Sequence, residues 1–304
     1  MVSLVMPTWK PHASWFPEAV SSALEEDRCE IELIVVDDGN PEPVAALLSG
    51  IDDPRLEVIA IPHRGVGGAR NAGIERASGE AIRFVDADDV VEPGSTAKLL
   101  ELSGPDGAIG YGSTLVCDID LRPEKTVGAT VQGDALVECM LGNFFVYITG
   151  MLFPRRVIEA AGDFDTGFEA NGDYDYVLRA LEHAPVRGED FVASRYRRHG
   201  ASITGRQPAA EVKSRRALDK LFERRPDLRG TRVERQARSH FQLGAATRML
   251  RAGQLGACAR HLLAALRLAP LSAAPAAAKL LRAFPRQGAR RLLVARRRWA
   301  RPRR

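Results

Sequence analysis

The 304-residue sequence has few cysteines and no long apolar run. Its four cysteines lie far apart without Cys-x-x-Cys spacing, which indicates reduced core thiols rather than a disulfide framework or a zinc site. No stretch approaches about 20 consecutive apolar residues, so no membrane-spanning helix is predicted. The opening residues, VSLVM, lack the basic start and apolar length of a signal peptide. We therefore expect a cytoplasmic protein, either soluble or peripheral on the cytoplasmic face of a membrane.

Acidic residues are almost missing from the last third of the chain. Residues 206–304 hold 26 Lys and Arg against 5 Asp and Glu. Residues 1–205 hold the other 17 basic and 34 acidic residues, so the net charge of +4 hides two oppositely charged parts. Such asymmetry is typical of two segments with different tasks. We expect a domain over 1–205 and a basic, Ala-, Arg- and Leu-rich helical extension over 206–304.

The first part of the chain alternates β-branched runs with helical stretches. Its expected strands are 2–6, 31–36, 56–61 and 81–85. Its expected helices are 14–26, 43–49 and 68–77. The short connections predict a parallel, right-handed α/β sheet covered on both faces. Past Gly94 the pattern is less regular.

Weaker signals in the rest of the chain give further expectations. The additional expected helices are 95–102, 134–142 and 173–182, and the additional strands are 108–117, 144–153 and 190–196. Beyond residue 208 we expect only helices, with breaks at Pro226, Gly253, Pro270, Pro275 and Pro285. Residues 244–268 resemble one helical hairpin without a second copy.

Carboxylates follow two of the expected strands at the point where each strand ends. Asp37 and Asp38 come after IELIVV, whereas Asp86, Asp88 and Asp89 come after AIRFV. Ligands of open parallel sheets bind outside the carboxyl ends of the strands. Carboxylate pairs suit a divalent cation, Mg²⁺ or Mn²⁺, which also binds phosphates. The alternative is that both clusters form solvated turns or cap the following helices.

A glycine-rich segment, HRGVGGARNAGIERASGE (63–80), lies between the two acidic clusters. Its glycines allow the backbone to approach either a ligand or packed neighbours. Arg70 near a helix start is placed to meet a phosphate. The spacing does not match a dinucleotide-binding fingerprint.

Together these segments resemble the family 2 glycosyltransferases. VSLVMPTW, IELIVVDDGN, GVGGARNAGIERASGE and FVDADD occur in the family's order and spacing. The block GDFDTGFEANGDYDYVLRAL (162–181) resembles a later family segment, and RYRRHGASIT (195–204) is similar to the ending of non-processive members. The resemblance implies the GT-A fold over residues 1–205, a Rossmann-like, mostly parallel sheet that binds nucleotide-diphospho-sugars.

The resemblance implies where the nucleotide of the donor would bind. Trp9 is similar in place to the aromatic residue that stacks on the base, with Pro7 shaping the turn before it. Asp38, with Asp37 beside it, matches the acid that contacts the base.

The resemblance also implies how the diphosphate and a metal would be held. Arg70 resembles the donor-site arginine of the family, with Asn71 positioning the turn. Asp86 and Asp88 match the D-x-D motif, in which Asp88 binds the divalent cation and Asp86 serves the ribose or the metal. His199 is a candidate metal or diphosphate contact, because neutral imidazole binds divalent ions. The alternative for His199 is an ordinary surface residue.

Asp173 matches the catalytic base of the family. In an inverting transfer this carboxylate takes the proton of the acceptor hydroxyl as its oxygen attacks the anomeric carbon. Helix capping is the alternative role for Asp173. Gly172 stands where the family has Glu, so Glu169 and Asp175 remain alternative bases.

The leading hypothesis is a bacterial, metal-dependent inverting glycosyltransferase of the hexosyltransferase type. It would move one sugar from a nucleotide-diphospho-sugar to a glycan or lipid-linked acceptor, in cell-surface glycan, polysaccharide or glycolipid synthesis. The alternatives are an impaired sugar-nucleotide-binding module and a sugar nucleotidyltransferase. The extension, ending RRLLVARRRWARPRR, predicts attraction to an anionic membrane, with polyanionic glycan binding or a solvated face as alternatives. Nothing resembles a reader of specific nucleic acid.

Overall fold

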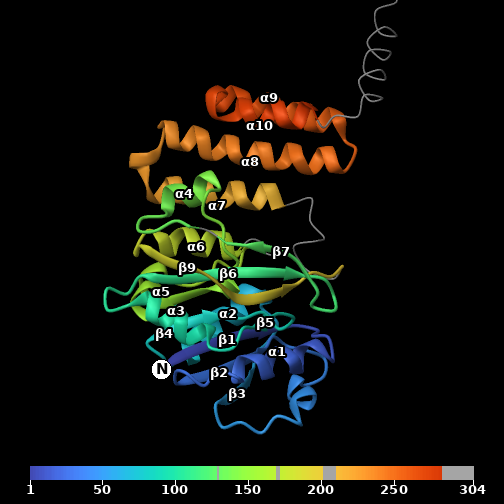
Figure 1. Cartoon of the computed structure of the whole chain (residues 1–304), viewed down its shortest axis with the longest axis vertical. Helices are drawn as coiled ribbons and strands as arrows, with labels where there is room; N and C mark the ends of the chain where they lie inside the picture. The colour runs from blue at the N-terminus through green and yellow to red at the C-terminus, as the bar shows by residue number, and fades with distance from the viewer. Residues whose placement is uncertain (129, 169–171, 201–209, 283–304) are drawn as a thin grey trace, which may run out of the picture. The chain divides into compact units, whose positions relative to one another are not determined.

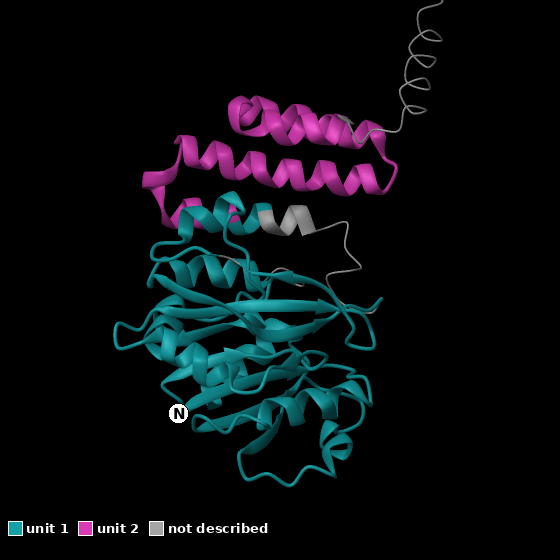
Figure 2. Cartoon of the chain, viewed as in Figure 1, with its two compact units in different colours: residues 1–217 teal, residues 218–304 magenta. Residues whose placement is uncertain are grey.

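The structure is a computed structural model that describes residues 1–128, 130–168, 172–200 and 210–282. The chain forms two compact units, residues 1–217 and 218–304 (Figure 2). The domain boundary expected between residues 205 and 206 lies outside the described residues. The junction between the two units falls inside helix α7 (Ala210–Arg224).

The first unit is built on one mixed sheet with the strand order β3-β2-β1-β4-β8-β6-β9-β5, to which β7 adds beside β6 (Figure 1). The strands are β1 (Val2–Thr8), β2 (Ile31–Asp37), β3 (Leu56–Ala60), β4 (Ala81–Phe84), β5 (Val90–Val91), β6 (Ile109–Cys117), β7 (Pro123–Val127), β8 (Met151–Pro154) and β9 (Val186–Arg197). The helices are α1 (Trp15–Leu24), η1 (Val44–Leu48), α2 (Gly65–Arg76), α3 (Ser95–Ser103), α4 (Leu136–Leu141), η2 (Ile148–Gly150), α5 (Arg155–Ala161) and α6 (Gly172–Leu181).

The parallel half of the sheet confirms the expected α/β core. β1 pairs in parallel with both β2 and β4, and β2 pairs in parallel with β3. The apolar runs of β1 and β2 are buried on both faces, as parallel strands require. Their carboxyl ends therefore meet at one edge of the sheet.

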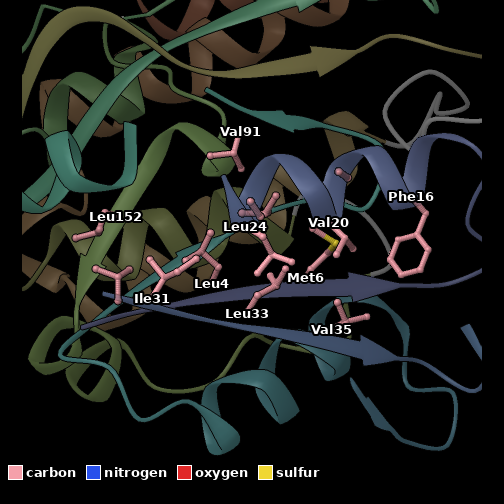
Figure 3. Packing of buried hydrophobic residues seen from close by; sticks show 14 of the residues in the cluster. Leu4, Met6, Phe16, Val20, Leu24, Ile31, Leu33, Val35, Val91 and Leu152 are labelled. Atoms are coloured by element: carbon pink, nitrogen blue, oxygen red, sulfur yellow. The ribbon is translucent and has the colours of Figure 1, made fainter. Parts of the chain in front are cut away.

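Helices cover both faces of this half. Leu4 and Met6 of β1 pack in one apolar cluster with Val20 and Leu24 of α1 (Figure 3). The other face of β1 meets α2, where a Cβ on Gly73 would lie 2.2 Å from Cγ1 of Val5. The glycine is needed for this close contact between helix and strand.

Pro7 does not end the first strand, contrary to the expectation of a strand over 2–6. β1 continues to Thr8 and pairs with β2 along its whole length. On its other side, β1 pairs with β4 only as far as Val5. No hydrogen bond between β1 and β4 therefore needs the N–H that Pro7 lacks.

Residues 144–153 do not form the single strand that their apolar composition suggested. They hold the turn η2 followed by the first residues of β8. The buried guanidinium of Arg83 donates to the Thr149 carbonyl from Nε (3.2 Å) and Nη2 (3.1 Å), which fixes the turn. The hydrogen bonds from Arg83, which is distant in the chain, therefore override the preference of residues 144–153 for a strand.

The described residues of the second unit are helical. Its elements are η4 (Pro226–Leu228), α8 (Arg232–Arg251), α9 (Leu255–Leu268) and α10 (Pro270–Arg282). α8 and α9 form the expected hairpin, and Ala246, Cys258 and Ala277 bring all three long helices into one small core. Pro275 lies inside α10, so the break expected there is wrong. Pro285 lies outside the described residues.

The start of α8 shows a reciprocal cap. The Thr231 hydroxyl accepts from the Glu234 N–H (3.3 Å), and the Glu234 carboxylate accepts from the Gly230 N–H (2.7 Å).

In the part of the chain that the structure describes, no helix combines the length and apolar character needed to cross a bilayer.

Candidate active site

The expected site residues gather where β1, β2 and β4 end. Residues 86–89 form a turn closed by a 3.1 Å hydrogen bond from the Asp89 N–H to the Asp86 carbonyl. Asp86 and Asp88 therefore lie in a turn and not on an extended strand. In this turn each of the three acids has a different partner.

Asp86 pairs with the arginine of the glycine-rich segment. The Arg70 Nη2 atom donates to Asp86 Oδ1 at 2.8 Å, and the Arg70 side chain is almost fully buried. Its guanidinium lies 5.3 Å from the ring centre of Phe164 and 5.8 Å from that of Phe84. Because α2 is packed against β1 and β2, the helix holds this cation at the end of β4.

Asp88 pairs with His199, just after β9. The Asp88 Oδ2 and His199 Nε2 atoms lie 2.7 Å apart. Burial raises the pKa of Asp88, and the charge of Asp86 raises it further. The ring of Trp15 lies 4.8 Å from the His199 ring. The structure thus joins residues 111 positions apart in the chain.

Asp89 is tied to β9 rather than capping the next helix. Its Oδ1 atom accepts from the Arg197 N–H at 3.0 Å. Its Oδ2 atom is buried without a hydrogen-bond partner among the described residues. Burial and the charges of Asp88 and Asp86 hold the pKa of Asp89 well above its ordinary value.

These acids fit a divalent cation as partial ligands. No group of three or more Asp, Glu, His or Cys side chains in the described ranges is arranged as a complete metal cage. Mg²⁺ and similar ions bind through one or two carboxylates together with substrate phosphates and water. Asp88 is the candidate for such a role, with Asp86 in the same turn and His199 Nε2 at 2.7 Å from its Oδ2.

Asp37 holds its own loop. Its Oδ1 atom accepts from the Asn40 N–H (2.9 Å) and Nδ2 (2.7 Å), and its Oδ2 accepts from the Val44 N–H (3.2 Å). Burial alone would raise the pKa of Asp37, but these hydrogen bonds together lower it. Asp37 therefore shapes the turn after β2 and leaves Asp38 as the acid that faces the glycine-rich segment.

Asp38 lies beneath a pair of stacked rings. The side chain of Asp38 is 2% exposed, and its Oδ2 lies 2.8 Å from Nδ1 of His63. The His63 ring stacks on the ring of Trp9 at 4.0 Å between centres. The Asp38 Oδ1 atom also accepts from the Arg64 N–H at 2.7 Å. Trp9 itself is exposed, and Pro7 lies within β1 two residues before it.

Asn71 connects α2 to the segment that leads to Asp173. Its Nδ2 donates to the Phe164 carbonyl (3.0 Å), and its Oδ1 accepts from the Phe164 N–H (2.7 Å). Phe164 stacks on Tyr176 of α6 at 3.8 Å between ring centres. Asn71 thus fixes the position of α6, the helix that carries Asp173, relative to Arg70.

Asp173 lies in the first turn of α6, within electrostatic range of Arg70 and Asp86. Burial raises the pKa of Asp173, the charge of Arg70 lowers it, and that of Asp86 raises it. A carboxylate with a raised pKa beside a fixed cation is suited to receive a proton.

Of the other bases considered, Asp175 is unsuitable. It is fully buried and its Oδ2 atom lies 3.1 Å from Nε of Arg179. Glu169 lies outside the described residues. Among the described residues, a Cβ on Gly172 would meet only the Phe168 Cβ, at 3.4 Å.

Two contacts were not expected from the sequence. Arg197 holds the acidic turn through Asp89 and donates from Nε to the Asp88 carbonyl at 3.2 Å. His63 contacts Asp38 and Trp9. Arg197 lies two residues before His199 in the block RYRRHGASIT, of which only the histidine was expected in the site.

The fold and the site define a class of protein. A parallel half-sheet covered by helices, with carboxylates at the carboxyl ends of its strands, agrees with the GT-A fold that the sequence resemblance implied. Residues 3–158 match the profile of "Glycosyl transferase family 2". The chain belongs to this family.

Several relatives carry family names. The "Succinoglycan biosynthesis protein ExoO" of Rhizobium meliloti is 32% identical over 54% of this chain and 51% of its own length. An uncharacterized glycosyltransferase of Nostoc is 27% identical over 66% of each chain. The chain thus spans about half to two thirds of the length of these relatives.

A solved structure confirms the fold. The crystal structure of S. aureus TarS 1-349 in complex with UDP-GlcNAc superposes with a TM-score of 0.58 at 14% identity. The match covers 88% of this chain and 82% of the TarS 1-349 chain. The GT-A fold expected from the sequence is therefore confirmed, together with the helices after it.

Proposed function

We propose that this protein is an inverting glycosyltransferase that moves one hexosyl unit from a nucleoside-diphosphate sugar to a hydroxyl acceptor. The convergence of Arg70, Asp86 and Asp173 at the carboxyl ends of the strands carries this proposal. The crystal structure of TarS 1-349 contains UDP-GlcNAc, which supports a nucleoside-diphosphate sugar as the donor of this protein. The similarity to ExoO supports a role in polysaccharide biosynthesis.

In the proposed reaction the donor's base lies against Trp9 and His63, above Asp38. Arg70 faces the diphosphate, where its fixed charge stabilises the negative charge that develops on the leaving group. Asp173 takes the proton from the acceptor hydroxyl as the acceptor oxygen bonds to the anomeric carbon. The bond from that carbon to the diphosphate breaks, and its electron pair stays on the diphosphate.

A divalent cation, Mg²⁺ or Mn²⁺, bound by Asp88 with Asp86 and His199 would supply further positive charge for the diphosphate. The chain's own contribution is to hold these ligands in place. Arg197 fixes the turn that carries them through its bonds to Asp89 and Asp88.

Two variants separate binding from chemistry. We expect Asp88→Ala to lose the rise in melting temperature that nucleoside diphosphates give with Mg²⁺, because bound ligands stabilise only the folded protein. Asp173→Asn should keep that rise but lower donor turnover by about 10²–10⁴-fold. Nucleotide release from a panel of sugar nucleotides measures turnover. Turnover by Asp173→Asn at the wild-type rate would contradict the assigned base.

The second unit supports a membrane-associated form of this enzyme. Residues 232–282 hold nine Lys and Arg and a single acid, Glu234. Leu271 and Leu281 of α10 are 86% and 57% exposed, and Leu263 of α9 is 55% exposed. Exposed leucines among cations are typical of a surface that lies on anionic lipid. We place the enzyme on the cytoplasmic face of a membrane, next to a lipid-linked or glycan acceptor.

A further inference from the structure

Three aromatic side chains that the reaction above does not use lie in contact with one another. The rings of Tyr147 and Tyr196 stack at 4.7 Å between centres, with an angle of 19° between their planes. Phe145 meets Tyr147 edge to face at 5.4 Å. Phe145 is 54% exposed, and both tyrosines are partly exposed. We call these three residues the aromatic ladder.

The inner end of the ladder lies beside the acidic turn. Tyr196 directly precedes Arg197, whose N–H bonds to Asp89. The neighbouring pair in the β5–β9 register, Val90 with Arg195, fixes this alignment. Burial and the neighbouring Tyr196, Asp89 and Asp173 raise the pKa of Tyr147 to about 12, which agrees with that placement.

A buried arginine anchors both tyrosines. Arg83 donates to the Thr149 carbonyl, in the turn that follows Tyr147. It also donates from Nη2 to the Ala193 carbonyl at 2.7 Å, in the strand that carries Tyr196. Thr149 Oγ1 and Ser194 Oγ lie 3.1 Å apart and join the same two segments. The segments that carry Tyr147 and Tyr196 are therefore joined by buried hydrogen bonds.

The ladder and the Trp9–His63 stack lie on opposite sides of β4 in the strand order. Trp9 follows β1 and His63 follows β3, so their stack belongs to the β3-β2-β1 end of the strand order. Phe145 and Tyr147 come just before η2, and Tyr196 lies in β9. In the strand order these elements come after β4, the strand that leads to the turn with Asp86 and Asp88. A ligand on the ladder is thus separated from the nucleotide by the acids, and Asp173 is in electrostatic range of Tyr147.

We infer that the aromatic ladder binds a sugar ring of the acceptor, so that the acceptor is a saccharide. This inference rests on the proposed glycosyl transfer. A sugar ring has an apolar C–H face and a rim of hydroxyls, which match the ring faces and phenol groups of the ladder. A lipid chain would need a continuous apolar groove. Here Arg198, two residues after Tyr196 in the chain, pairs with Glu124, so charged groups lie close to this part of β9.

The test measures saccharide binding separately from nucleotide binding. The full chain is loaded with Mg²⁺ and the nucleoside diphosphate that raises its melting temperature most. Saturation-transfer NMR then uses methyl glycosides of a hexose, an N-acetylhexosamine, a deoxyhexose and a uronic acid as probes. We expect transfer to the ring C–H protons of at least one glycoside. Phe145→Ala should reduce that transfer about fivefold.

Matched variants distinguish the possible results. Tyr147→Phe keeps the stacking ring and should keep most of the transfer, and Val58→Ala, an exposed apolar change on the edge strand β3, should leave it unchanged. All three variants should keep the nucleotide-induced rise in melting temperature. Wild-type transfer in Phe145→Ala, or no transfer from the wild-type protein to any glycoside, would overturn the ladder assignment. A wild-type protein that no nucleoside diphosphate stabilises would instead overturn the proposed function.

Discussion

As the proposed base, Asp173 should set the pH range in which the proposed reaction can run. Its carboxylate must be ionised to accept a proton, and burial raises its pKa while Arg70 opposes that rise. A base with a raised pKa loses activity as the pH falls through that raised value. The charged groups that act on it are Arg70 and Asp86.

We therefore predict that the acid limb of kcat/KM for the sugar nucleotide lies above pH 3.8, the ordinary pKa of an aspartate. A pH profile of nucleotide release measures this limb. Asp52→Asn, a change at an exposed aspartate, should leave the profile unchanged. An acid limb at or below the ordinary aspartate value would show that another group limits the reaction.

Single residues differ in how far the sequence could predict them. Arg70, Asp86, Asp88 and Asp173 lie in motifs, and the structure brings these residues to one edge of the sheet. The partners of the acids were not predicted, because Arg197 meets Asp89 across 108 residues. No local pattern encodes a contact between a strand near the end of the domain and a turn near its middle.

At the scale of elements, the packing of α2 on the sheet determines where Arg70 lies. Gly73 and Gly67 are both in α2, but a Cβ on Gly73 would lie 2.2 Å from Val5, whereas one on Gly67 would lie 3.5 Å from Phe164. Only the first approach is too close for a methyl group. The two glycines therefore offer a matched comparison.

Gly73→Ala should lower the free energy of unfolding by about 1–3 kcal/mol, because the added methyl group overpacks the helix–strand contact. Gly67→Ala should leave it unchanged or raise it by about 0.5–1 kcal/mol through the lower entropy of the unfolded chain. Urea denaturation measures both. Equal effects of the two substitutions would contradict the packing described for α2.

The elements that the sequence predicted well are the long apolar ones. β1 and β2 follow continuous apolar runs, and they appear close to the expected bounds. Two-residue β5 was not expected, since its pairing with β9 depends on a distant strand rather than on its own residues. The segment over 144–153 was misjudged because Arg83, elsewhere in the sheet, holds its turn.

For the whole molecule, the excess of Lys and Arg after residue 205 predicts that the protein binds to anionic membranes. The full chain should bind vesicles containing phosphatidylglycerol and ignore phosphatidylcholine vesicles, and high salt should weaken the binding. Replacing Leu271 and Leu281 by Ser should weaken it about tenfold or more through lost apolar burial. Vesicle flotation measures each case.

Leu47→Ser, an exposed apolar change in the first unit, serves as the control and should not alter flotation. Binding to neutral and anionic vesicles alike would show that charge does not direct the association. Unchanged flotation of the Leu271 and Leu281 double variant would remove α10 from the membrane-binding surface.

The bond between Arg197 and Asp89 has a consequence for how the enzyme matures on the ribosome. The donor-side strands are translated within the first 90 residues, but the strand that steadies their acidic turn emerges more than a hundred residues later. Domains acquire their native contacts only after the necessary chain has left the exit tunnel. A nascent chain halted before β9 should therefore contain Asp86, Asp88 and Asp89 but lack the contact from Arg197 that orders their turn. We therefore expect the enzyme to gain its activity late in its own synthesis.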